Sequence, residues 1–237
     1  MAIRLITLDL DHTLWDTDPV LVAAEAAMFR WISEHSPDTL SLYPPAKMAE
    51  YKNQIAASYP ELRDKVSALR KATLMRVFLQ TGNDRERAEA MAEEAFRVFY
   101  EARSQLPLFD GVEEVMRRLK QEYQLIAVTN GNADLKLAGH DHLFDDLFNA
   151  DLHGDAKPAP DLFQRALDKA GVAAAEAIHI GDHPQQDIAA AQQLGMKTIW
   201  FNNKGREWPL DGVQPDRIFT HWAELHPAIS ALAADQS

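Results

Sequence analysis

The fold is decided by the stretch Ile3–Asp16, which reads IRLITLDLDHTLWD. Its first half is nearly continuously apolar and too short for a surface helix, which is typical of a strand buried inside a parallel sheet. Asp9 and Asp11 follow two residues apart, so both carboxylates should leave the same face at the strand end. A single Asp here would indicate a turn cap. Two buried carboxylates need a neutralising cation, so the pair followed by Thr13 favours a functional site.

The whole chain sets the broad class. Its 237 residues are 46% hydrophobic and 25% charged, as in ordinary globular proteins. A formal net charge of -12 argues against a nucleic-acid partner, because phosphate backbones need basic surface. The absence of cysteine excludes disulfide and thiolate chemistry. No apolar run has the length of a membrane span and no secretory signal precedes the first strand, so we expect no membrane association and a cytoplasmic location.

Residues 17–105 are expected to be helical. Apolar residues recur there at helical spacing, for example Leu62, Val66, Leu69, Thr73 and Val77. Pro and Gly clusters separate four such segments, which predicts a small four-helix bundle. Its aromatic and Met residues are interpreted as bundle core rather than as a ligand box: Phe29, Trp31, Met75, Phe78 and Phe96.

From Leu106 onward, helical segments alternate with short apolar strands. Such alternation predicts an α/β fold, with a parallel Rossmann-like sheet and helices on both faces. Strands are expected at residues 123–130, 177–181, 197–202 and 217–220. The opening strand belongs to the same sheet. The predicted domains are therefore a core of residues 1–16 and 106–237, and an inserted helical cap of residues 17–105.

Polar residues follow the predicted strands, where open sheets of this class bind ligands. Three such clusters, besides Asp9 and Asp11, are Thr129 with Asn130, Lys157 in a loop, and Asp182 with Asp187. Each alone has a structural interpretation as a turn, a solvated lysine or a helix cap. All of them in this order on this scaffold favour a common site.

This set resembles the haloacid dehalogenase-like hydrolase superfamily. Its four motifs are matched by Asp9-x-Asp11-x-Thr13, by Thr129 with Asn130-Gly131, by Lys157-Pro158, and by Gly181-Asp182-x4-Asp187. A helical insert directly after the first motif resembles the C1 type of cap. The chain departs from the common pattern at His12, where many members have Gly or Asp, and at Gln186, where Asn is frequent.

The resemblance implies a phosphatase that works through an aspartyl-phosphate. Asp9 would be the nucleophile and Asp11 the general acid and base. Thr129, Asn130 and Lys157 would bind the phosphate, with Thr129 and Lys157 also counted among the catalytic groups. At about 4 Å and an effective dielectric near 20, each pair of like charges costs roughly 4 kcal/mol. One lysine does not offset that repulsion.

A divalent cation is therefore expected among the acidic residues of the site. Carboxylate, carbonyl and water ligands select a hard ion such as Mg²⁺. The implied ligands are Asp9, Asp11 through its main-chain carbonyl, Asp182, and Asp187 either directly or through water.

Several alternatives stay open. A phosphosugar mutase would keep Asp11, whereas a 2-haloacid dehalogenase has no alcohol to protonate and lacks that acid. A non-catalytic binding protein would have degraded motifs. The residues around these motifs are similar to those of bacterial phosphatases that act on flavin mononucleotide or on a phosphorylated ribitylaminouracil riboflavin precursor. Pyrimidine 5'-nucleotidases are nearly as similar. The expected partner is a small phosphorylated metabolite, and the chain is either a monomer or a homodimer.

Overall fold

Strand β1 (Leu5–Leu8) lies in the middle of a six-stranded parallel sheet, and all four of its residues are buried. It pairs with β2 (Gln124–Thr129) on one side and β4 (Ala177–Gly181) on the other. The strand order is β3-β2-β1-β4-β5-β6, with β3 at Asp146–Asn149, β5 at Lys197–Phe201 and β6 at Arg217–Phe219. The predicted α/β fold class is confirmed.

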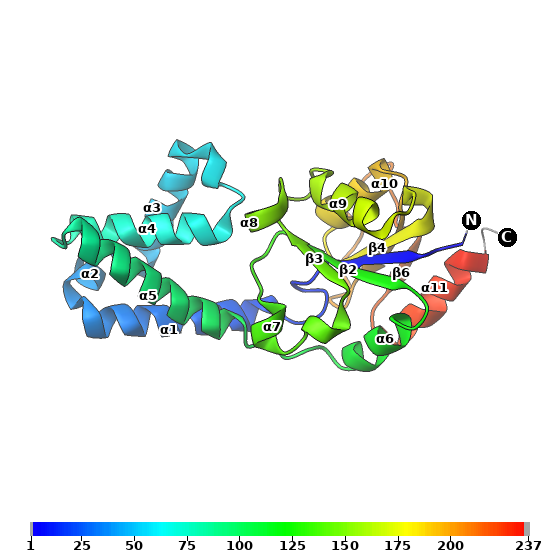
Figure 1. Cartoon of the computed structure of the whole chain (residues 1–237), viewed down its shortest axis with the longest axis horizontal. Helices are drawn as coiled ribbons and strands as arrows, with labels where there is room; N and C mark the ends of the chain where they lie inside the picture. The colour runs from blue at the N-terminus through cyan, green and yellow to red at the C-terminus, as the bar shows by residue number, and fades with distance from the viewer. Residues whose placement is uncertain (1, 235–237) are drawn as a thin grey trace. The chain divides into compact units, whose positions relative to one another are not determined.

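Helices cover both faces of this sheet, with α9 and α10 on one face and α6 and α11 on the other (Figure 1). Apolar residues of α9, including Phe163, pack with Leu5 and Ile126 of the sheet in one buried cluster. A π-helical turn at Pro184–Ala189 precedes α10. The helices are α6 (Val112–Leu119), α8 (Ala150–His153), α9 (Asp161–Ala170), α10 (Ala190–Gln193) and α11 (Leu225–Ala234).

Strand β3 was not predicted from the sequence. It lies at the sheet edge, and its sequence Asp-Leu-Phe-Asn leaves three of four residues only partly buried. An edge strand needs no continuous apolar run, so the signal that identified β1 is missing here.

The computed structural model describes residues 2–234, which divide into two compact units. One comprises residues 2–16, 107–131 and 139–234, and the other residues 17–106 and 132–138. The second unit thus adds residues 132–138, with helix α7 (Leu135–Ala138), to the helical insert.

The helical unit has five main helices, one more than the four predicted, because Pro37–Leu42 forms a short helix of its own. They are α1 (Thr17–His35), α2 (Pro37–Leu42), α3 (Pro45–Ser58), α4 (Val66–Gln80) and α5 (Arg85–Arg103). Asp84 caps the N-terminus of helix α5, and its side chain accepts a hydrogen bond from the Arg87 backbone N–H. Phe78 and Phe96 are buried in the core of this unit as expected, whereas Phe29, Trp31 and Met75 pack against it half-buried.

None of the helices in the described part of the chain combines the length and the apolar character that crossing a bilayer requires.

Candidate active site

Asp9 lies one residue beyond β1 and is almost completely buried, with 7% of its surface exposed. Its backbone N–H donates to the Ile180 carbonyl, which continues the pairing with β4. Its side chain accepts hydrogen bonds on both oxygens, from Lys157 Nζ at 2.8 Å on Oδ1 and from Thr13 Oγ1 at 3.2 Å on Oδ2. Strand β1 therefore positions the Asp9 carboxylate, and the two hydrogen bonds fix its orientation.

Lys157 is buried with its amine among oxygen atoms. Nζ donates to Asp9 Oδ1, to Asp187 Oδ1 at 2.6 Å and to the Val128 carbonyl at 2.8 Å. Burial alone would lower the pKa of Lys157, but the two carboxylates outweigh it and raise the pKa. The interpretation of Lys157 as a solvated surface lysine is therefore wrong. Its three donors are all used here, so a phosphate oxygen would have to replace one of these acceptors.

Asn130 clamps the backbone of Lys157. Its amide Nδ2 donates to the Lys157 carbonyl at 2.8 Å, and its Oδ1 accepts from the Lys157 N–H at 2.7 Å. The neighbouring Thr129 is buried, and its Oγ1 accepts from the Gly131 N–H at 2.9 Å. The structure thus brings Thr129, the last residue of β2, and Asn130, which follows it, together with the loop that carries Lys157.

Three carboxylates gather at the ends of β1 and β4. Single ligand oxygens of Asp9, Asp182 and Asp187 all lie within 4.8 Å of one another. Burial raises the pKa of Asp9 to about 8, with Lys157 opposing and the two other acids adding to the shift. Burial and Asp187 also raise the pKa of Asp182, against Arg206.

The pKa of Asp187 shifts in the opposite direction, because more hydrogen-bond donors surround this carboxylate. Burial would raise its pKa, but Lys157 and His179 outweigh burial and hold the pKa below its ordinary value. His179 Nε2 lies 3.3 Å from Oδ1, and the His183 backbone N–H donates to Oδ2 at 2.8 Å. With donors on both oxygens, Asp187 suits a metal contact through water better than a direct one.

The donor set fits a hard divalent cation. It consists of carboxylates without any thiolate, which is the ligand chemistry of Mg²⁺. The raised pKa of Asp9 shows how costly its charge is when only Lys157 compensates it. A cation bound by Asp9 and Asp182 would remove that cost.

Asp11 is held beside the site by a tryptophan. The Trp15 indole Nε1 donates to Asp11 Oδ1 at 2.9 Å, and Trp15 is completely buried. The other oxygen lies so close to Gly131 that a Cβ built on this glycine would come within 2.2 Å of Oδ2. A buried Trp15 has no free face for a planar substrate, so it packs and donates a hydrogen bond instead.

His12, one residue beyond Asp11, has a φ of 62°. Glycine adopts this left-handed conformation without a steric cost. This explains why glycine is common at this position in the family whose motifs the chain resembles.

Sequence reasoning missed two groups at the site. His179 stands within the apolar strand β4 and is fully buried, with Nδ1 2.8 Å from Thr7 Oγ1 and Nε2 facing Asp187. The available signal was a single histidine within an otherwise apolar predicted strand. Arg206 donates to the carbonyl and to Oδ2 of Asp182, at 2.9 and 3.1 Å. It comes from a loop after β5 that no motif marks.

Comparison with known proteins identifies relatives along most of the chain. A family model described as haloacid dehalogenase-like hydrolase matches residues 3–195. The chain is 28% identical over 199 residues to the 5-amino-6-(5-phospho-D-ribitylamino)uracil phosphatase YigB of Escherichia coli, covering 84% of this chain and 83% of that protein. It is 29% identical to a phosphoglycolate phosphatase of Xanthomonas campestris, covering 87% and 88% of the two chains.

A solved structure also matches closely. It is titled 2-haloacid dehalogenase from Pseudomonas syringae and superposes with a TM-score of 0.93 at 36% identity, over 97% of this chain and 99% of that one. Motifs, sheet order and family model agree, and the chain belongs to the haloacid dehalogenase-like hydrolases.

Proposed function

We propose that this chain is a Mg²⁺-dependent phosphatase of small phosphorylated metabolites that works through a phosphorylated Asp9. The chain is a phosphoric monoester hydrolase of its family. The observation that carries the mechanistic proposal is the buried Asp9 carboxylate, held by Lys157 and Thr13 and facing Asp182 and Asp187.

The first step transfers the phosphoryl group to the protein. An Asp9 oxygen attacks phosphorus, the ester P–O bond breaks, and the leaving oxygen takes the proton of the Asp11 carboxyl group. Lys157 and the backbone after Thr129 would hold the phosphate oxygens. A bound Mg²⁺ would supply the positive charge that keeps Asp9 ionised and balances the phosphate.

The second step restores the enzyme. The Asp11 carboxylate takes a proton from a water molecule whose oxygen attacks the phosphorus of the Asp9 acyl phosphate. The Asp9–phosphate bond breaks, which releases inorganic phosphate and leaves Asp9 ionised and Asp11 protonated. The two steps need no co-reactant besides water.

The substrate class follows from the relatives of the chain. YigB is named for a phosphorylated ribitylaminouracil and aligns with 84% of this chain at 28% identity, which supports a riboflavin precursor or flavin mononucleotide as first candidates. A panel that also holds phosphoglycolate, pyrimidine nucleotides and hexose phosphates tests this, with phosphate release as the signal. Turnover dominated by sugar phosphates would argue against the riboflavin assignment.

The reaction class has a direct test. Purified protein should hydrolyse 4-nitrophenyl phosphate with added Mg²⁺, lose activity with a chelator, and lose it in Asp9→Asn. Hydrolysis that survives both treatments would refute the proposed mechanism.

A second candidate is hydrolytic dehalogenation, because the matched Pseudomonas syringae structure is titled a 2-haloacid dehalogenase. Release of halide from a carbon atom needs no proton on the leaving group, so Asp11 and its hydrogen bond from Trp15 would have no task there. Halide release from 2-chloropropanoate without hydrolysis of any phosphate ester would favour this candidate over the phosphatase.

A further inference from the structure

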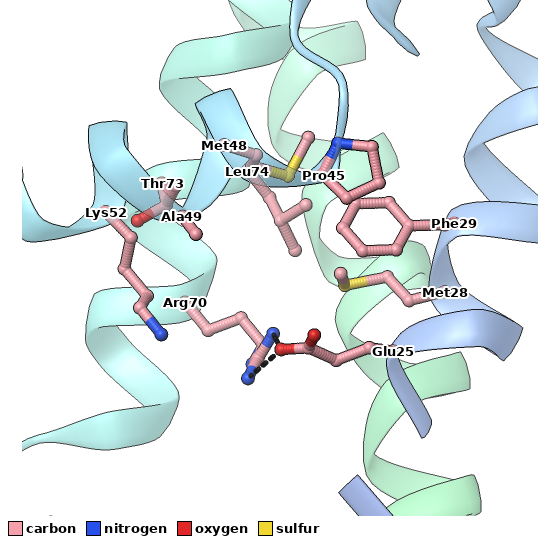
Figure 2. Close-up of a pocket in the computed structure, with 10 residues that line it drawn as sticks. All are labelled: Glu25, Met28, Phe29, Pro45, Met48, Ala49, Lys52, Arg70, Thr73 and Leu74. Atoms are coloured by element: carbon pink, nitrogen blue, oxygen red, sulfur yellow. Dashed lines mark hydrogen bonds and ion pairs between the residues drawn. The ribbon is translucent and has the colours of Figure 1, made fainter. Parts of the chain in front are cut away.

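The helical unit contains a pocket lined by α1, α3 and α4 (Figure 2). Its walls are mostly apolar and include Met28, Phe29, Met48 and Leu74. Its volume is about 40 Å³, enough for about three water-sized groups at roughly 10–15 Å³ each. It therefore has room for a group of a few heavy atoms.

Two cationic side chains enter this pocket, against one carboxylate. Lys52 and Arg70 line it from α3 and α4, and Glu25 lines it from α1. Arg70 is mostly buried and Lys52 is about half-buried, and burial together with the Arg70 charge lowers the pKa of Lys52. This leaves one positive charge in excess, in a chain whose formal net charge is -12.

The carboxylate present is a poor partner for either cation. Both Arg70 terminal nitrogens reach the same Glu25 oxygen at 3.4 Å, longer than the 2.7–2.9 Å typical of such charged bonds. One face of the Arg70 guanidinium lies 3.7 Å from the centre of the Phe99 ring. The Lys52 amine makes no hydrogen bond or ion pair with any residue that the structure describes, although its side chain points toward Arg70 (Figure 2).

We propose that this pocket binds the carboxylate group of a small organic anion, with the carboxylate between Lys52 and Arg70 and its carbon chain against Met28 and Met48. A carboxylate has three heavy atoms, which matches the volume, and a planar pair of oxygens suits a guanidinium. The carboxylate belongs either to a substrate or to a separate effector. The proposal does not depend on the phosphatase mechanism, because binding is measured without turnover.

The test is a titration of the whole chain, labelled with ¹³C at the methionine methyl groups, with sodium butanoate. The methyl signals of Met28 and Met48 should shift saturably, while Met116 and Met196 of the other unit stay in place. Butanamide, of the same shape without charge, should cause no such shift. Arg70→Gln and Lys52→Gln should each weaken binding about tenfold or more, and Arg97→Gln, at an exposed ion pair on α5, should not.

Shifts that butanamide reproduces, that both pocket variants keep, or that spread equally over all methionines would overturn the proposal. Methyl spectra of each variant without ligand show whether it is folded. In wild-type protein, inhibition of 4-nitrophenyl phosphate hydrolysis by butanoate shows whether the carboxylate belongs to a substrate or to a separate effector. Competition with the ester indicates a substrate carboxylate, and a change in kcat alone indicates an effector.

A second observation concerns the orientation of the Asp11 side chain, and its interpretation depends on the proposed phosphatase mechanism. An indole N–H is a donor only, so the hydrogen bond from Trp15 Nε1 makes Asp11 Oδ1 an acceptor. We propose that Trp15 is a positioning residue that fixes the orientation of the Asp11 side chain, with Oδ1 held by the indole and Oδ2 beside Gly131.

Trp15→Phe tests this proposal, because it keeps a ring and removes only the donor. Loss of acid positioning should slow phenyl phosphate about tenfold more than 4-nitrophenyl phosphate, since nitrophenolate leaves without a proton. The ratio of the two rates in one sample does not depend on how much enzyme is folded. Trp222→Phe, which removes a buried indole donor to the Thr13 carbonyl, is the matched control and should leave the ratio unchanged.

Equal slowing of both esters by Trp15→Phe would overturn the positioning role. Failure of the phosphatase assignment itself is distinguishable, because wild-type protein would then hydrolyse neither ester.

Discussion

The cost of the Asp9 charge predicts how Mg²⁺ stabilises the protein at different pH values. Burial raises the pKa of Asp9 from 3.8 to about 8 without a metal. The proton on the folded carboxyl group therefore stabilises the metal-free protein fully below pH 4, and this contribution is lost as pH rises toward 8. At about 1.4 kcal/mol per pH unit, the loss is on the order of 5 kcal/mol.

Binding of Mg²⁺ would reverse this loss, because the proposed ligand is the carboxylate and its proton would have to leave. Between pH 5.5 and 8 the apparent Kd for Mg²⁺ should fall by up to about tenfold per pH unit and then level off. The stabilisation by a fixed Mg²⁺ concentration should therefore grow with pH over the same window.

The assay is urea unfolding at pH 5.5, 7 and 8.5, with either Mg²⁺ or a chelator. Asp9→Asn is the control, because it keeps the shape of the residue and has no proton to release. The other shifted groups, Asp182, Asp187 and His179, remain in both proteins, so the difference between the two isolates Asp9. A Mg²⁺ stabilisation that is constant or falls with rising pH in the wild-type protein would refute the reasoning.

Three further changes test other parts of the structure. Lys157→Met leaves two buried carboxylates unpaired and should lower the free energy of unfolding at pH 8 by about 3–5 kcal/mol in urea; a loss no larger than that of the exposed Arg97→Met would contradict the buried network. Gly131→Ala should displace Asp11, because its Cβ would lie 2.2 Å from Oδ2, and should lower kcat with little change in unfolding; wild-type kcat would show that this contact is unimportant. Phe78→Ala, at a fully buried site in the helical unit, should cost about 3–5 kcal/mol by the same unfolding assay, and a change below 1 kcal/mol would mean that the helices repack.

The sheet could be predicted where burial is uniform along a strand. The residues of β1, β2, β4 and β5 are nearly all buried, so their sequences are apolar runs that the pattern identifies. Strand β3 was not predicted because its sequence Asp-Leu-Phe-Asn begins and ends with polar residues, which an edge position allows. The other edge strand, β6, was predicted although it is also only partly buried. The addition of α7 to the helical unit also has no local signal, since it depends on contacts between residues far apart in sequence.

The candidate site, like the fold, could be predicted only in part. The order of Asp9, Thr129, Lys157 and Asp182 along alternating strands predicted that they meet at one sheet edge, and parallel topology places them there. The partners of these residues were not predictable. The Trp15 bond to Asp11 and the His179 contact with Asp187 depend on side-chain directions that spacing does not fix.

Transfer of a phosphoryl group to Asp9 is the central step of the proposed mechanism, and mass spectrometry tests this step most directly. Asp11→Asn protein, which lacks the base for the second step, is mixed with Mg²⁺ and 4-nitrophenyl phosphate, quenched in acid and digested. We predict the added mass of one phosphoryl group on the peptide that contains Asp9, and its absence in a variant that also carries Asp9→Asn. Ester hydrolysis by wild-type protein with no such adduct on Asp9, or with the adduct on another residue, would contradict the account.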